Sequence, residues 1–172
     1  MKIGIIADTH DNIYAIRQAV CFFNTQNLKY VIHAGDYIAP FSLKELMNVN
    51  SKFFGVFGNN DGERKGLLAV CKDIHEPPYD FILDGKHIMV THMIESLSKR
   101  SIVNTDIIVS AHTHTHRKLS RVILCTSIQV NVEDGYMTKV QSQYLTLRHS
   151  MQKLLIFQRC LWVKVTDVQT IY

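Results

Sequence analysis

The stretch Lys2-Ile3-Gly4-Ile5-Ile6-Ala7-Asp8-Thr9-His10 is a short apolar run that leads directly into polar, metal-capable side chains. The apolar part predicts a buried β-strand, and the polar part predicts the loop that follows it. The same arrangement returns twice. The run at 30–34 is closed by Gly35-Asp36, and the run at 52–57 is closed by Gly58-Asn59-Asn60-Asp61-Gly62. We therefore expect an open sheet with parallel strands, whose loops form a ligand site at the carboxyl ends of the strands.

Helical patterns separate these strands. After Asn12, the expected N-cap, apolar residues recur at helical spacing from 13 to 23. Pro40 suits the first turn of a second helix, and residues 64–72 are expected to form a third. Strand–helix units of this kind are typical of an α/β domain.

The second half of the chain changes pattern. Residues 81–83 and 87–91 flank Asp84-Gly85, which predicts a hairpin with a type I′ turn. A short helix at 94–99 and a strand at 106–110 are expected next, followed by Ala111-His112-Thr113-His114. Strands after units of strand and helix indicate that parallel and antiparallel pairing occur together. Beyond residue 129, the spacing of apolar residues at 140–154 favours a helix, and the alternation at 161–165 favours a strand.

Composition and length indicate one domain over residues 1–172 of a 172-residue chain. Hydrophobic residues make up 47% and charged residues 20%, which argues against a disordered or fibrous protein. No apolar run approaches the ~20 residues of a membrane span, and the N-terminus becomes acidic too early for a signal peptide. The four cysteines form no C-x-x-C pair, so free thiols and a cytoplasmic protein are expected.

The net charge of +4 is unevenly distributed. Residues 1–116 hold 11 Lys and Arg against 12 Asp and Glu, whereas residues 117–172 hold 8 against 3. The basic C-terminal part could suit an anionic partner, although a solvated face is the simpler interpretation. No basic run with interleaved aromatic residues is present, which argues against nucleic-acid binding. The sequence is compatible with a homo-oligomer.

Seven metal-capable side chains follow five apolar runs, each at the point where a strand is expected to end. They are Asp8, His10, Asp36, Asn59, His92, His112 and His114. Seven ligands suit two metal ions, because a carboxylate has two oxygens and can bridge two cations. Mixed Asp, Asn and His ligands without a thiolate favour Mn²⁺, Fe²⁺, Ni²⁺, Co²⁺ or Zn²⁺. His33 lies inside the second strand and is expected to be a packed histidine.

This motif series resembles the calcineurin-like metallophosphoesterases, and most of all their small prokaryotic YfcE-type phosphodiesterase branch, over roughly residues 1–120. The resemblance implies a four-layer α/β/β/α sandwich with two mixed β-sheets and a dinuclear metal centre on one rim. It also implies a metal-dependent phosphodiesterase that acts on a small phosphodiester, with Mn²⁺ or Ni²⁺ as the first candidates. A hydroxide held between the ions would attack phosphorus in line with the leaving group.

The resemblance also implies a role for each residue by its position. The first metal would be held by Asp8, His10, Asp36 and His114. The second would be held by Asp36, Asn59, His92 and His112. Asp36 would bridge the ions, and Asn60 would face the substrate phosphate, so Asp36 and Asn60 are the expected catalytic residues.

Several positions depart from the family pattern. In the phosphatases of the superfamily, a histidine follows the metal-binding Asn and an Asp orients it, whereas here these positions are Asn60 and Ala39. An amide cannot deliver a proton, which favours esters whose leaving group departs as a stable anion. Glycines usual in the family are replaced by Met93 and Ala111, and residues 129–172 match the pattern poorly. The alternative function is a non-catalytic protein-binding module on the same fold, as in the retromer subunit.

Overall fold

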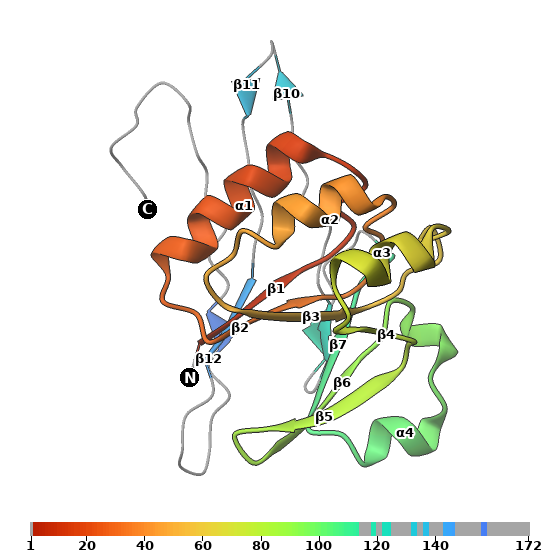
Figure 1. Ribbon diagram of the computed structural model, residues 1–172. Coiled ribbons are helices and arrows are strands. Elements are labelled where there is room, and N and C mark those ends of the chain that lie inside the picture. The colour runs from red at the N-terminus through yellow and green to blue at the C-terminus, as the bar shows by residue number, and fades with distance from the viewer. Residues whose placement is uncertain are drawn as a thin grey trace.

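Two β-sheets lie face to face, and helices cover both outer faces of the pair (Figure 1). The computed structural model describes residues 2–113 and the short strands at 118–119, 122–124, 132–133, 136–137, 143–146 and 156–157. The predicted α/β/β/α sandwich with two mixed sheets is confirmed by this arrangement.

The first sheet has the strand order β13-β12-β1-β2-β3-β4. Its strands are β1 (Lys2–Ile6), β2 (Tyr30–His33), β3 (Lys52–Val56), β4 (Ile74–His75), β12 (Gln143–Thr146) and β13 (Ile156–Phe157). β1 to β4 are parallel. β12 runs antiparallel to β1, with Lys2 opposite Thr146, and β13 runs antiparallel to β12. β1 therefore lies inside the sheet, between an early strand and a late one.

The second sheet has the strand order β5-β6-β7-β9-β8. Its strands are β5 (Tyr79–Leu83), β6 (Lys86–Val90), β7 (Ile107–Ser110), β8 (Lys118–Leu119) and β9 (Val122–Leu124). β5 and β6 form the predicted hairpin, and the positive φ angles of Asp84 (54°) and Gly85 (72°) agree with a type I′ turn. β6, β7 and β9 are parallel neighbours. A separate antiparallel pair consists of β10 (Val132–Glu133) and β11 (Tyr136–Met137).

The helices follow the expected positions, with one exception. They are α1 (Ile13–Thr25), α2 (Pro40–Leu46), α3 (Arg64–Val70), the 3₁₀ turn η1 (Ile94–Ser96) and α4 (Lys99–Val103). The Asn12 side chain accepts a hydrogen bond from the Ala15 N–H and caps α1, and Pro40 occupies the first turn of α2. The helix expected at 94–99 is instead the turn η1 followed by α4, because Ser98 caps a new helix by accepting the Ser101 N–H.

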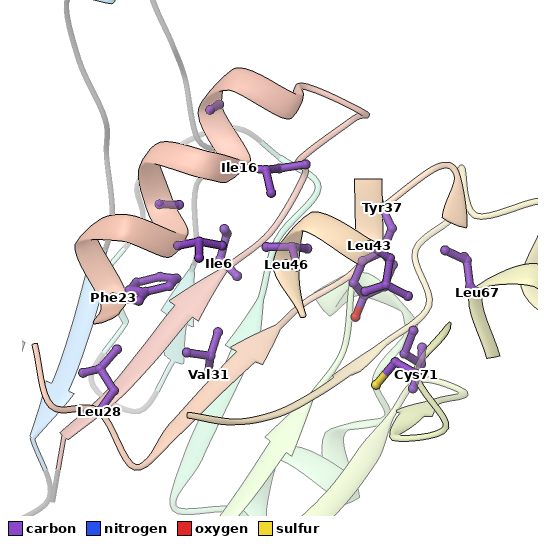
Figure 2. Close-up of a cluster of buried hydrophobic side chains, with 14 of the residues drawn as sticks. Ile6, Ile16, Phe23, Leu28, Val31, Tyr37, Leu43, Leu46, Leu67 and Cys71 are labelled. Carbon is purple, nitrogen blue, oxygen red and sulfur yellow. The ribbon is translucent and has the colours of Figure 1, made fainter. Parts of the chain in front are cut away.

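Alternation along the strands builds a separate core on each face of the first sheet. Ile6 and Val31 belong to the core that this sheet forms with α1, α2 and α3 (Figure 2), whereas Ile3 and Ile5 face the second sheet. Each of these four side chains is at most 1% exposed. The remaining face of the second sheet contributes Met89 and packs against η1 and α4. Three apolar layers thus hold the four structural layers together.

The tail differs from its prediction. The spacing of apolar residues at 140–154 favoured a helix, but β12 lies within this range, so that prediction is wrong for residues 143–146. Residues 143–146 form backbone hydrogen bonds with β1, and this tertiary pairing outweighs the helical spacing of their apolar side chains. The strand expected at 161–165 lies outside the described residues. Within the part of the chain that the structure describes, Cys21 and Cys71 are free thiols, and none of the helices is long and apolar enough to cross a bilayer.

Candidate metal centre

The polar residues singled out in the sequence meet at one rim of the sandwich. Asp8 and His10 follow β1, and Asp36 follows β2 in the same sheet. His92 follows β6 and His112 follows β7 in the other sheet. Because neighbouring strands in each group are parallel, all five residues leave carboxyl ends of strands. The rim therefore combines side chains from both sheets.

Asp36 stands at the centre of this group. Ligand-type atoms of Asp8, His10 and Asp36 all lie within 4.8 Å of one another. The Oδ2 atom of Asp36 lies 3.8 Å from His10 Nε2 and 3.3 Å from His92 Nε2. The His112 ring lies 5.2 Å from the His92 ring, measured between centroids. One carboxylate oxygen thus separates a histidine of the first sheet from a histidine of the second.

Two further predicted residues follow β3. Asn59 is exposed at the end of this strand, and Asn60 is its neighbour. Asn60 donates its backbone N–H to Asp36 Oδ1 (2.9 Å) and its side-chain amide to Asp36 Oδ2 (2.7 Å). The resemblance had placed Asn60 toward the substrate, whereas in the structure its amide contacts the central carboxylate. The remaining predicted ligand, His114, lies outside the described residues.

The hydrogen bonds of His92 define its tautomer. Its Nδ1 lies 2.8 Å from the Ala34 carbonyl oxygen, which can only accept, so Nδ1 carries the hydrogen. Its Nε2 is buried, forms no hydrogen bond with the described residues, and faces the carboxylates of Asp36 and Asp8 at 3.3 and 3.9 Å. A neutral ring would aim its Nε2 lone pair at two carboxylates, which is repulsive, so the arrangement favours a positive charge there, either a proton on the ring or a metal ion. The ring is therefore oriented as metal-binding histidines are.

The protonation preferences of the centre agree with this geometry. Burial alone would lower the pKa of His92, but its contacts with Asp36 and the Ala34 carbonyl outweigh burial and raise that pKa. Burial alone would raise the pKa of Asp36, but the proximity of His92 and the hydrogen bonds from Asn60 hold it well below its usual range. Asp36 is thus ionised at neutral pH, and its surroundings favour positive charge.

Unusual backbone conformations gather at the same rim. Left-handed φ angles occur at Asp8 (50°), His10 (41°), Asp36 (63°) and His112 (68°), and at the β-branched Ile38 (81°). Left-handed conformations are uncommon for residues other than glycine and cost of order 1–3 kcal/mol each. Such strain persists only where surrounding contacts enforce it, and it concentrates at functional sites.

A buried chain of hydrogen bonds joins the loops after β1 and β2. The Gly35 N–H donates to His33 Nδ1 (3.1 Å), so His33 Nε2 carries the hydrogen and donates to Thr9 Oγ1 (3.1 Å). The Thr9 hydroxyl in turn donates to the Asp36 carbonyl (3.4 Å). Burial, followed by the proximity of His92, lowers the pKa of His33 well below its ordinary value. The prediction of a packed histidine is confirmed, and the neutral ring links two ligand-bearing loops.

Sequence reasoning gave no role to Asp61, which the structure buries beneath the loop after β2. Its carboxylate accepts backbone N–H groups from Asp36, Tyr37, Ile38 and Gly58. The available signal was an Asp inside a run rich in glycine and asparagine, where short acidic side chains commonly bond to backbone N–H groups.

The fold accommodates the residues that depart from the family pattern. Ala111 is buried in the core between the sheets, and its N–H donates to the His92 carbonyl. Met93 is 37% exposed. Ala39 precedes α2 and donates its N–H to Asp11 Oδ1 (3.0 Å), so a carboxylate does lie beside this position, but it comes from the loop after β1.

The donor set suits a divalent cation. Two buried carboxylates and three imidazoles converge, without a thiolate among the residues that the structure describes. Carboxylate and imidazole donors together fit first-row divalent metals. Together with the sandwich fold, this rim defines an α/β protein with a candidate metal centre.

Comparison with known proteins gives the family. Residues 1–135 match the model of the calcineurin-like phosphoesterase superfamily domain. The chain is also 40% identical over 124 residues to phosphodiesterase MJ0936 of Methanocaldococcus jannaschii, an alignment that covers 66% of this chain and 74% of that protein. The protein belongs to the calcineurin-like phosphoesterase superfamily, which is a class of phosphoester hydrolases.

Solved structures show the same fold. A structure described as a novel archaeal phosphodiesterase is 30% identical, with a TM-score of 0.70 over 85% of this chain and 93% of that one. The phosphoesterase YfcE of E. coli is 18% identical, with a TM-score of 0.62 over 85% and 88% of the two chains. Vps29 of Entamoeba histolytica is 13% identical, with a TM-score of 0.62 over 86% of each chain. The last two likenesses concern the fold alone.

Proposed function

We propose that this protein is a metal-dependent phosphodiesterase with two divalent ions at the rim. The observation that carries the proposal is the position of Asp36 Oδ2 between His10 Nε2 and His92 Nε2, at 3.8 and 3.3 Å. Asp8, His10, Asp36 and His114 would hold one ion. Asp36, Asn59, His92 and His112 would hold the other. The 40% identity to a phosphodiesterase supports the diester as the substrate class.

When bound, the ions would supply an activated water and would neutralise charge on the phosphoryl oxygens. The residues of the chain prepare the site for this chemistry. Asp36 stays ionised because the neighbouring His92 and the hydrogen bonds from Asn60 to both of its oxygens favour the charged form. His92 presents Nε2 to Asp36 because its Nδ1 donates to the Ala34 carbonyl. The Asn60 amide cannot protonate a leaving oxygen. Esters with acidic leaving groups are therefore the expected substrates.

The proposal is tested by comparing two histidines in or next to β6. His92 follows β6 at the rim, whereas His87 lies near the start of β6, where Nδ1 contacts the Asn104 carbonyl. Purified wild-type protein should contain about two Mn²⁺ or Ni²⁺ ions per chain after reconstitution, by elemental analysis. It should hydrolyse bis(4-nitrophenyl) phosphate and lose this activity on chelation. His92→Gln should lower metal content and turnover, and His87→Gln should change neither.

The alternative is a non-catalytic binding module. It is supported by the shared fold of Vps29 and by Met93 and Ala111, which replace glycines usual in the family. One Vps29 structure is described as a complex with Zn²⁺, so metal binding alone does not separate the two functions. Hydrolysis does. A wild-type protein that binds metal but leaves the diester intact would support the module and would contradict the phosphodiesterase.

A further inference from the structure

The Asp61 carboxylate is one of the most completely bonded groups near the rim. It is 2% exposed, and its partners are backbone N–H groups. Oδ1 accepts from Tyr37 (2.7 Å) and Ile38 (2.8 Å), and Oδ2 accepts from Asp36 (3.0 Å) and Gly58 (2.7 Å). Within the described part of the chain the Asp61 carboxylate forms no ion pair, and its hydrogen bonds come from oriented amides, while Arg64 Nε donates to the Asp61 backbone carbonyl (3.3 Å).

These four amides belong to the segments that carry proposed ligands. Residues 36–38 include Asp36 and Ile38, whose φ angles of 63° and 81° are left-handed. Three successive N–H groups that converge on one anion form the kind of concave binding nest that such backbone produces. The fourth amide, that of Gly58, directly precedes Asn59. One side chain therefore fixes the backbone next to two proposed ligands.

We propose that Asp61 is the positioning residue of the metal centre, whose carboxylate holds residues 36–38 and 58 so that Asp36 and Asn59 face the ions. The effect of this role on catalysis rests on the proposed function. Asp61 does not itself contact an ion. Its four hydrogen bonds compensate the strain at Asp36 and Ile38, and without them the loop would relax and carry the Asp36 carboxylate away from His10 and His92.

Asp61→Asn tests this role with little change of shape. The amide nitrogen replaces one acceptor oxygen, so two of the four N–H groups lose their partner and face another donor. The control is Thr105→Val. Thr105 is equally buried (2% exposed) and also hydrogen-bonded, but it precedes the start of β7, whereas the rim lies at the other end of this strand. The Mn²⁺ dissociation constant of Asp61→Asn, measured by calorimetry, should rise about 10–100-fold. That of Thr105→Val should not change.

A second measurement separates this proposal from the proposed function. In the metal-free protein, amide hydrogen exchange should show protection at residues 36–38 and 58. In Asp61→Asn this protection should be lost, whereas protection in β2 should persist. If wild-type protein binds no metal, the proposed function fails, while the exchange result still shows whether Asp61 orders the loop.

The outcomes that overturn the proposal are equally specific. Wild-type metal affinity and loop protection in Asp61→Asn would show that the four bonds do not position Asp36. If Asp61→Asn does not fold, Asp61→Glu retains the charge but displaces the carboxylate by one methylene, and it should fold with weakened metal binding. Failure of both variants to fold would assign Asp61 to the stability of the whole domain and would also overturn the positioning role.

Discussion

Gly58 offers the sharpest test of how tightly the Asp36 loop and the β3 loop are packed together. A Cβ atom added at Gly58 would lie 2.8 Å from the Asp36 carboxyl carbon and would overlap both Oδ1 and the backbone nitrogen of Asp36. Ordinary contacts begin at 3.4 Å, so the carboxyl carbon would have to move by at least about 0.6 Å, and the overlapped atoms farther. Gly58→Ala therefore displaces the proposed bridging ligand.

The expected cost follows from that displacement. Misplacement by about 1 Å can reduce turnover by about 10²-fold, equivalent to about 2.7 kcal/mol in the barrier. Overpacking should also lower the free energy of unfolding by about 1–3 kcal/mol. The assay is kcat/KM on bis(4-nitrophenyl) phosphate with added Mn²⁺, at a temperature where circular dichroism shows the variant folded.

The same loop contains its own control. A Cβ at Gly62 would meet no atom within 4 Å. Gly62→Ala should therefore keep wild-type activity and could gain about 0.4–1 kcal/mol of stability through the unfolded chain. If Gly58→Ala binds Mn²⁺ and turns over like the wild-type protein, the position of Asp36 is not critical, and the bridging role assigned to it is wrong.

Three other predictions concern the same rim. Asp36→Asn should weaken both metal sites and abolish turnover, whereas His10→Ala should affect mainly one, as elemental analysis of the two variants would show; near-normal rates in Asp36→Asn would contradict the ligand assignment. Because Asn60 cannot protonate a leaving group, rates should fall steeply as the leaving-group pKa rises. Asn60→His combined with Ala39→Asp should flatten this dependence more than either change alone. A shallow slope in the wild-type protein would point to another acid. The pKa of His33 is lowered in the folded protein, so below pH ~6.5 the ring takes up a proton in the unfolded chain but not in the folded one. The free energy of unfolding should therefore be constant with respect to His33 above pH ~6.5 and should fall below it, by up to about 1.4 kcal/mol per pH unit. Urea unfolding of the metal-free protein should show this slope below pH ~6.5, and His33→Gln should remove it; equal slopes in both proteins would mean that His33 takes up a proton without unfolding.

Much of the fold could be predicted because local signals and tertiary contacts agree. The hairpin at Asp84-Gly85 has the turn chemistry that its φ angles require, and Asn12 and Pro40 begin helices as their side chains favour. β12 could not be predicted from apolar spacing, because its conformation depends on pairing with β1, more than a hundred residues earlier. Local periodicity carries no information about such a distant partner.

The sequence predicts which side chains form the candidate site, but not the hydrogen bonds that hold them in place. Polar residues after apolar runs indicate which side chains reach the rim, since parallel strands end together. The contacts that orient these side chains have no comparable signal. Asp61 bonds to backbone amides, and His33 acts through Thr9, so neither role depends on a residue type that a motif would reveal. The amide of Asn60 lies on Asp36, a contact that depends on φ angles rather than on spacing.

The strand order of the first sheet has a consequence for protein synthesis. β1 is made well before β12, which covers one of its edges and is completed only at Thr146. At about 5–20 residues per second, roughly 7–28 seconds pass between the synthesis of β1 and that of this neighbour. During that interval its open edge can pair with another nascent chain. A shortened chain ending at residue 135, where the family match stops, would keep that edge open permanently. The least recognisable part of the sequence would then decide whether the protein aggregates as it is made.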